Sequence, residues 1–593
     1  MNLTRFAVGR RPVVLVAVLL ALLAGIDSFL TMSRREDPEI KIRNCVIDTR
    51  WAGAPAQKVE ELVTDAIEDA VYQLDTVKKV VSRSRTGVSV VNIELEDTVV
   101  EIEQAWDEVR AKVAQVQGAL PAGCGTPYVN SNFGDVAAVC LALYQQPLPG
   151  RGELGYRYSP RELEDYAEAL RSELKSLESV ASVSIEGVQK ERVTLEVDSR
   201  DWAKLGLTRG QLADLFQQRN IVAPGGSVAT ADGSYNVRPT GEIEELGELE
   251  SLVVGMREDV VPVQLGDVAA TLRRGYVDPP RNTLLFTNGD VTPDEVLLLA
   301  VTMKAGRNIV AMGAEIDAVV ARLSAGQLPP DLGITRVNDL PRQVDTLVVG
   351  FVDNLIQAVV IVLLVAFLMM GWRPALIMAA AVPLCMVSSI TVVKLLGVEL
   401  EQFSIASLII ALGMVVDNAI VVSDNTLSLL RQGRNRVEAV IEGASGLAVP
   451  IVTSTLTTVA AFAPMLTIAG GSGEYMRSLP IVVSVTLLIS WVVAMAVTPL
   501  FCFWLLKAPA EPQAASDEGP KGLAKRYDNV VRWCMGHKLV TLGGATLAFV
   551  ASLALVPLIG NQFFPGGHRD QFFVHVWMPD GAALEETEAT AEL

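Results

Sequence analysis

The sequence predicts an α+β membrane protein, in which a bundle of transmembrane helices carries a large water-facing insert of mixed α/β structure. Its mean hydropathy is +0.36 although 20% of its residues are charged. Such values require apolar and charged residues to lie in separate blocks. Seven apolar blocks are long enough to cross a bilayer. Residues 31–340, between the first block and the second, contain no comparable run.

The apolar blocks divide the chain into membrane and water-facing parts. We place the spans at Pro12–Leu30, Leu347–Met370, Ala375–Leu396, Phe403–Val422, Leu447–Ile468, Ile481–Leu506 and Val540–Ile559. We therefore expect a first transmembrane helix over 1–30, an external domain over 31–340, helices two to six over 341–507, a cytoplasmic linker over 508–536, a seventh helix over 537–560 and the start of a second external domain over 561–593. The first span is longer than a signal-peptide core and no small-residue cleavage site follows it, so we interpret it as an uncleaved anchor.

The basic residues of the short loops indicate the orientation of the spans. They precede the first span, separate the second from the third, follow the fourth and precede the seventh: Arg5, Arg10, Arg11, Arg373, Arg431, Arg434, Arg436, Lys521, Lys525, Arg526, Arg532 and Lys538. All of them fall on one side, which the positive-inside rule makes cytoplasmic. The external domain then faces away from the cytoplasm. The net charge of −19 gives no indication of nucleic-acid binding.

The external domain shows a repeated order of strands and helices. A strand-like stretch over 39–51 precedes a helical pattern over 57–74, a hairpin around Thr86-Gly87 and a helical pattern over 101–116. The order recurs with a helix over 159–177 followed by strands over 182–198, and again with a helix over 307–323 followed by a strand over 332–339. This pattern predicts split β-α-β, ferredoxin-like subdomains. Residues 223–238 interrupt them as a protruding hairpin.

Cysteine and histidine usage gives no indication of a metal centre or another cofactor. The three external cysteines, Cys45, Cys124 and Cys140, cannot all pair within the chain, and no close Cys–His cluster is typical of zinc. The chain has only three histidines.

The C-terminal part repeats the N-terminal order of elements. A span, the strand-like QFFVHVWM over 571–578 and a turn followed by a helix correspond to the first span, the strand around Cys45 and the helix after Gly53. Gly581 aligns with Gly53. Parallel repeats of this kind build many transporters, so we expect the chain to be the first half of a protein about twice as long.

The fourth span carries the strongest candidate for a functional residue. Asp417 lies within IASLIIALGMVVDNAIVV, and an ionisable side chain in hydrocarbon costs at least about 2.5–3.5 kcal/mol. We therefore predict that Asp417 carries a proton or ion, with a packing role as the alternative. Asp424 falls on the same helical face. Thr453, Thr455 and Thr457 of the fifth span could line the same route, or bond to the carbonyls of their own helix.

Several motifs resemble the resistance-nodulation-division (RND) efflux permeases, in the branch that exports hydrophobic and amphiphilic compounds. They are RRPVVLVAVLLALLAG, SRREDPEI, AGAPAQKVEELVT, VPVQLGDVA, AGRNIV, GMVVDNAIVVSDN and GEYMRSLP. The resemblance implies a homotrimeric antiporter of the bacterial inner membrane that uses a proton gradient and no cofactor. It further implies a periplasmic adaptor and an outer-membrane channel as partners, porter subdomains in the external domain, and a docking piece over about 183–272.

The chain departs from the pattern of the family at two positions. Asn418 follows Asp417 where many drug exporters have a second aspartate, so only one acid of the pair can titrate and Asn418 is expected to position it. Glu186 stands where drug exporters tend to have an aromatic pocket residue, which makes it a candidate substrate contact. The lysine that pairs with the acid in the family belongs to spans outside this chain. Export of heavy-metal cations and a non-transporting membrane scaffold remain alternatives.

Overall fold

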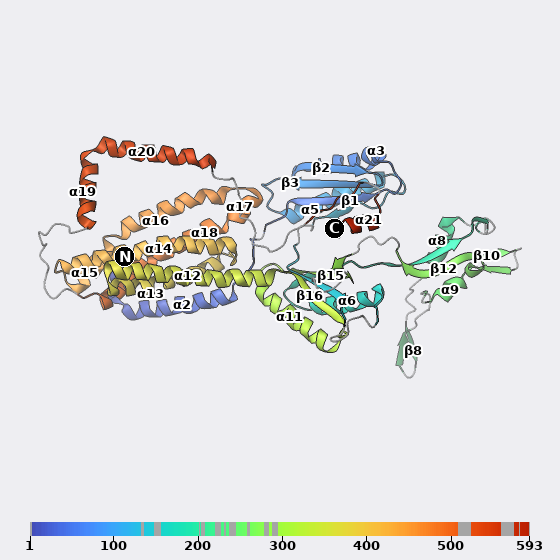
Figure 1. Cartoon of the computed structure of the whole chain (residues 1–593), viewed down its shortest axis with the longest axis horizontal. Helices are drawn as coiled ribbons and strands as arrows, with labels where there is room; N and C mark the ends of the chain where they lie inside the picture. The colour runs from blue at the N-terminus through green and yellow to red at the C-terminus, as the bar shows by residue number, and fades with distance from the viewer. Residues whose placement is uncertain are drawn as a thin grey trace.

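A computed structural model gives the arrangement of most of the chain. It describes residues 3–38, 40–131, 136–147, 156–200, 202, 208–219, 227–230, 233–236, 243, 245–257, 261–277, 284–287, 294–507, 523–558, 574–579 and 582–591. Figure 1 shows an elongated molecule with long helices at one end and the α/β structure at the other. Residues 508–522 of the predicted linker over 508–536, and parts of the predicted hairpin over 223–238, lie outside the described residues.

The described residues include seven helices that are long and apolar enough to cross a membrane, as predicted. They are α2 (Arg11–Thr31), α12 (Leu340–Met370), α13 (Trp372–Leu395), α14 (Gln402–Arg431), the helical stretch Arg436–Thr467 that contains α16 (Ala448–Phe462), the helical stretch Gly470–Leu505 that contains α18 (Ser478–Leu505), and α20 (Lys538–Leu555). The second begins earlier than the hydropathy indicates, since the Asp339 side chain accepts a hydrogen bond from the Arg342 amide and so caps α12 directly after the preceding strand.

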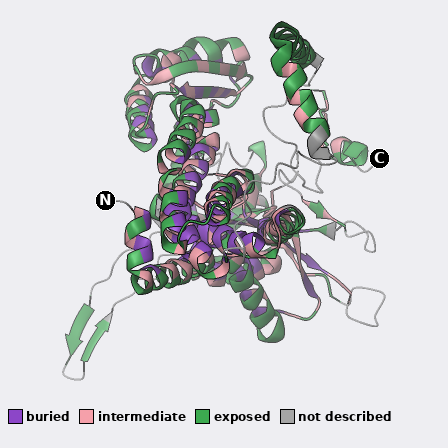
Figure 2. Cartoon of the chain, turned by 90° about the vertical axis from the view of Figure 1, so that its left-hand side faces the viewer, coloured by how far each residue is buried: buried purple, intermediate pink, exposed green. Residues whose placement is uncertain are grey.

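Helix α18 lies at the centre of the bundle. It packs against α13, α14 and α16, while α2 packs mainly against α13. Figure 2 shows the buried residues concentrated where the bundle helices face one another. Helix α20, by contrast, is exposed along its whole length.

The first α/β unit is a four-stranded antiparallel sheet with the order β2-β3-β1-β4. Its elements are β1 (Asn44–Arg50), α3 (Ala56–Val59), η1 (Glu60–Thr64), α4 (Asp65–Val71), β2 (Val77–Arg85), β3 (Val88–Leu95), α5 (Ile102–Val116), η2 (Gln117–Ala119) and β4 (Tyr128–Asn130). The order of connections is that of a split β-α-β unit. Trp106 of α5 is buried beneath the sheet with Ile47 and Ile93.

The second α/β unit repeats this topology with an interruption. Its sheet has the order β16-β5-β15-β6, from β5 (Val139–Gln145), α6 (Pro160–Lys175), β6 (Val180–Glu186), β15 (Leu297–Met303), α11 (Ile309–Gly326) and β16 (Leu332–Asp339). The two later recurrences of the sequence pattern therefore belong to one subdomain. The reason is that β6 and β15 pair across more than a hundred residues of sequence, a contact that local periodicity does not reveal.

Gly187 marks the point where the chain leaves the second sheet. Its φ is +90°, and a Cβ atom there would lie 2.7 Å from the carbonyl oxygen of Val296, so the position favours glycine. The insert that follows carries β7 (Glu191–Val197), α8 (Arg209–Arg219), β8 (Ser227–Thr230), β9 (Gly233–Asn236), α9 (Leu246–Glu250), β10 (Val253–Arg257), β11 (Val261–Gln264), α10 (Leu265–Val268), β12 (Ala269–Tyr276), β13 (Leu285–Phe286) and β14 (Asp294–Glu295).

Two-stranded ribbons form most of this insert. Strand β7 pairs with β12 and not with its sequence neighbour β6. Strands β8 and β9 form the predicted hairpin, which projects to one side of the insert, below it in the view of Figure 1.

Shorter helices complete the described structure. They are α1 (Leu3–Gly9), α15 (Arg436–Ser445), η3 (Ala463–Thr467), α17 (Gly470–Met476), α19 (Leu523–Gly536), η4 (Val556–Leu558) and α21 (Leu584–Ala591). The strand predicted over 571–578 is wrong for its described part, because residues 574–578 are not in a strand. A strand needs a hydrogen-bonding neighbour, and these residues have none in the described sheets.

Candidate functional site

Helix α14 positions the predicted acidic residues. Its N-terminus is fixed by a capping box, in which the Glu401 carboxylate accepts hydrogen bonds from the amides of Phe403 (2.8 Å) and Ser404 (3.2 Å). The Ser404 hydroxyl in turn accepts from the Glu401 amide at 2.8 Å. These bonds satisfy amide groups that a helix start leaves unpaired.

One face of α14 is buried and the opposite face is open. The buried face packs on α13 and α18 through Leu408, Leu412, Val415, Ala419 and Val422. The open face carries Ile410, Gly413, Asp417, Val421, Asp424 and Ser428, all exposed and spaced at three or four residues. We call these six residues the α14 stripe.

Both acids of the stripe lack a protein partner in the described part of the chain. No hydrogen bond or ion pair joins Asp417 or Asp424 to another described residue. The two carboxylates stand about 10 Å apart along the axis at the rise of an α-helix. A membrane-spanning helix therefore presents two unpaired acids on one face.

Asn418 faces α18 and not the stripe. Its side-chain amide donates to the Ser490 hydroxyl at 3.0 Å, and Ser490 donates to the Val415 carbonyl at 3.3 Å. Between these helices and α13 lies a cavity of only about 10 Å³, at the lower limit for one water molecule. The Asn418–Ser490 contact therefore holds α14 tightly on α18. Sequence reasoning missed Ser490, although a hydroxyl within an apolar span is the signal that indicates such a contact.

The predicted threonines lie on α16, which packs on α18 and α15. Thr453 and Thr457 are exposed, and Thr455 is buried. The Thr457 hydroxyl donates to the Thr453 carbonyl at 2.8 Å, and Thr458 donates to the Ser454 carbonyl at 3.1 Å. These hydroxyls therefore bond to their own helix. The described contacts do not bring them to Asp417.

The end of the bundle that carries α17 is tied to the α/β region by polar contacts. Arg43, just before β1, forms an ion pair with Glu474 of α17 at 2.7 Å. The Tyr475 hydroxyl donates to Asp37 at 2.9 Å. Nearby, Glu401 is only 2% exposed, and this burial raises its pKa to about 7, against the lowering effect of its backbone hydrogen bonds.

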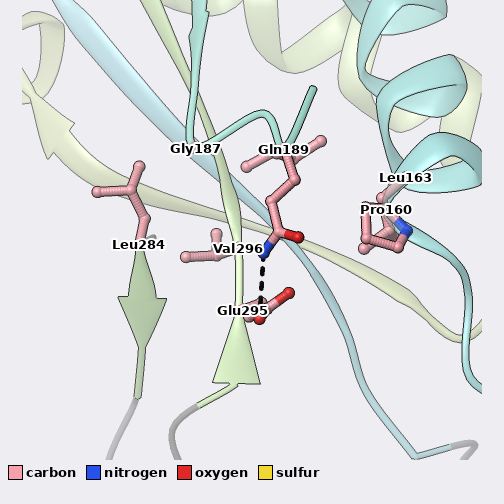
Figure 3. Close-up of a pocket in the computed structure, with 8 residues that line it drawn as sticks. Pro160, Leu163, Gly187, Gln189, Leu284, Glu295 and Val296 are labelled. Atoms are coloured by element: carbon pink, nitrogen blue, oxygen red, sulfur yellow. Dashed lines mark hydrogen bonds between the residues drawn. The ribbon is translucent and has the colours of Figure 1, made fainter. Parts of the chain in front are cut away.

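Glu186 lies exposed at the end of β6, where it pairs in register with Leu298 of β15. The adjacent pocket is lined by Pro160, Leu163, Gly187, Gln189, Leu284, Glu295, Val296 and Leu297. Figure 3 shows the Gln189 amide donating to Glu295 across it at 3.4 Å. Its volume of about 20 Å³ accommodates a water molecule. Glu186 is not among its lining residues.

The whole chain, and not only α14, has the features of one transporter family. It combines a bundle of membrane-spanning helices, two split β-α-β units between its first two spans and an acid within the fourth span. The sequence pattern of the AcrB/AcrD/AcrF family matches residues 3–593. The chain therefore belongs to the AcrB/AcrD/AcrF family of RND efflux permeases.

Proposed function

We propose that this permease uses the proton gradient to export hydrophobic or amphiphilic small molecules, with Asp417 as the group that takes up and releases the proton. The observation that carries the proposal is the α14 stripe. An acid within a membrane span, exposed and without a described partner, is costly unless it faces water or other polar groups. We infer that polar groups or water cover the stripe in the working assembly.

Proton uptake by Asp417 would change the packing that α14 prefers. The protonated form carries no charge and tolerates an apolar neighbour, whereas the carboxylate requires a polar one. Moving one proton across a membrane supplies about 2.3 kcal/mol per 100 mV. At about 1.4 kcal/mol per tenfold change, this energy sustains a concentration ratio of roughly fifty. The proton gradient is thus sufficient to drive export of a neutral compound.

The α/β units would handle the exported compound. We assign the two split β-α-β units as porter subdomains, and the insert between β6 and β15 as a docking piece that carries the β8–β9 hairpin. Glu186, exposed beside the junction of the second unit and the insert, is the proposed contact for the compound. Members of the family generally work as trimers with adaptor and outer-membrane channel proteins, and we propose the same partners and an inner-membrane location here.

Replacing Asp417 tests the proposed proton coupling. Asp417→Asn removes the titratable group but keeps its size, so efflux of an amphiphilic dye from exporter-deficient cells should fall to the background. Asp27→Asn provides a matched control, because Asp27 is an exposed acid close to the end of its span α2 (Arg11–Thr31), whereas Asp417 lies at the middle of α14. This control should export normally. Efflux by Asp417→Asn at the wild-type protein level would refute the proposal.

Asn418→Ala distinguishes proton carriage from helix positioning. Asn418 cannot titrate, and its substitution removes one hydrogen bond to Ser490, worth about 1 kcal/mol. We expect reduced efflux that keeps its dependence on the proton gradient. Ser490→Ala removes the same hydrogen bond from the other side and should have a similar effect.

A further inference from the structure

An arginine-lined pocket lies at the end of the bundle opposite the α/β units. Its volume is about 450 Å³, and its lining includes Arg5, Val8, Arg11, Pro12, Val437 and Ile441. These residues belong to α1, the start of α2, and α15, which lie at that end of the molecule (Figure 1). The size is within the range of about 300–1,000 Å³ that is usual for ligand pockets.

The walls of the pocket are held in place by contacts to the rest of the bundle. The Thr4 hydroxyl of α1 donates to the Met495 carbonyl of α18 at 3.0 Å. The Arg11 guanidinium donates to the Val8 carbonyl at 3.1 Å, and Arg436 donates to the Trp504 carbonyl at 3.1 Å. The helix is interrupted between α1 and α2 at Arg10, and residues on both sides of this interruption line the pocket. The pocket is thus formed by fixed elements.

The pocket has a strong excess of positive charge. The Arg11 guanidinium lies 3.8 Å from the centre of the Phe503 ring, and that of Arg436 lies 5.0 Å from the same ring. Two cations therefore share one aromatic ring. No acidic residue lines the pocket, and no ion pair joins Arg5, Arg11 or Arg436 to a carboxylate in the described part of the chain. On α15, Glu442 forms an ion pair with Arg434 at 4.0 Å.

The residues that line the pocket suit an amphiphilic anion. Arg5 and Arg11 provide two guanidinium groups, which match the oxygens of a phosphate. Next to the lining residue Val437, the Nε atom of Arg436 is buried without a hydrogen-bond partner among the described residues. Val8, Pro12, Val437 and Ile441 provide an apolar surface beside them. Because α2 and α18 are candidate spans, both features lie at a membrane boundary, where basic pockets between helices bind anionic lipid headgroups.

We propose that this pocket binds the phosphate headgroup of an anionic phospholipid of the cytoplasmic leaflet, with Arg5 and Arg11 as its ligands and the apolar residues against the glycerol and upper acyl chains. A zwitterionic lipid binds more weakly, because its amine meets the excess of arginines. The lipid would hold α1 and α15 together where both meet the bundle. This site is independent of the proton route on α14.

Lipid retention by the purified protein tests the proposal. The full-length permease in detergent is offered phosphatidylglycerol or phosphatidylcholine with the same acyl chains, and native mass spectrometry measures the bound fraction. Wild type should retain phosphatidylglycerol preferentially. A basic residue near an anionic surface typically contributes about fivefold in affinity. The double variant Arg5→Ala/Arg11→Ala should therefore bind phosphatidylglycerol about thirtyfold more weakly than wild type.

Two further variants separate a built site from general surface charge. Arg10→Ala is the matched control, since Arg10 is next to Arg11 but does not line the pocket, and it should retain the lipid. Arg5→Lys/Arg11→Lys keeps both charges and should recover at least half of the binding that the alanine variant loses. This result is expected even if the alanine variant folds poorly. An equal loss in Arg10→Ala, or equal retention of both lipids by wild type, would refute the site. Displacement of phosphatidylglycerol by inorganic phosphate at equal concentration would show a simple anion site and refute lipid recognition.

Discussion

Glu401 shows how a single side chain connects the membrane helices to the α/β region. It caps α14, the helix that carries Asp417, and it is buried close to Asp37 and to the α17 contacts of the α/β region. Its sequence context, VELEQ, indicates a solvated loop, so sequence reasoning did not identify it. Burial, which only the tertiary structure provides, is what raises its pKa to about 7.

The raised pKa makes stability depend on pH. In the folded state Glu401 keeps its proton up to about pH 7, whereas the unfolded chain releases it near 4.5. The folded state therefore binds more protons across this window, and the free energy of unfolding should fall as pH rises through it, by about 3 kcal/mol at most. Thermal unfolding in detergent, followed by tryptophan fluorescence, should show this decline in wild type and a flatter profile in Glu401→Gln.

The neighbouring Glu399 provides the control for this measurement. It forms a partly exposed ion pair with Arg35 at 3.6 Å. Glu399→Gln should leave the decline between pH 4.5 and 7 in place. A decline of the same size in Glu401→Gln would contradict the assignment to Glu401.

At the level of elements, the packing of α2 on α13 depends on a glycine. A methyl group on Gly25 would overlap both the side chain and the carbonyl group of Val387, so the two helices approach as small residues allow in membranes. Gly25→Ala should destabilise the protein by about 1–3 kcal/mol through overpacking, measured as a lower unfolding temperature. Gly350→Ala in α12 meets no atom within 4 Å and should be neutral or stabilising by up to about 1 kcal/mol. A neutral Gly25→Ala would show that α2 is free to move.

The local sequence pattern predicts the helices and strands better than it predicts which strands pair. The seven spans and the β2–β3 and β8–β9 hairpins follow from hydropathy, alternation and turn residues that lie close together in sequence. The pairing of β6 with β15 does not, because the intervening insert forms its own ribbons. The acids of the α14 stripe were identifiable as charges in an apolar run. The Asn418–Ser490 bond was not, since it joins residues of two different spans.

At the scale of the whole molecule, the distribution of charge and of α/β structure predicts its orientation. The α/β units and the insert lie at one end of the bundle, and α15 with its basic neighbours lies at the other (Figure 1). The positive-inside rule assigns the arginine-rich end to the cytoplasm. Cys124 follows α5 in the first α/β unit and Cys534 lies in α19, after the sixth span. Both are partly exposed free thiols, so we expect them to report on opposite sides of the membrane.

Thiol labelling in intact spheroplasts tests this orientation. Variants that retain only Cys124 or only Cys534 are treated from outside with a membrane-impermeant maleimide. Cys124 should be labelled and Cys534 should react only after permeabilisation.

Partial burial raises the pKa of Cys124, which lowers its thiolate fraction and slows the reaction, so labelling of Cys124 should accelerate from pH 7 to 8.5. Cys45 is fully buried, and a Cys45-only variant should stay unlabelled in the folded protein, which excludes labelling through unfolding. Reaction of Cys534 from outside before permeabilisation would reverse the orientation, and would place the α/β units and the arginine pocket on the opposite sides to those inferred here.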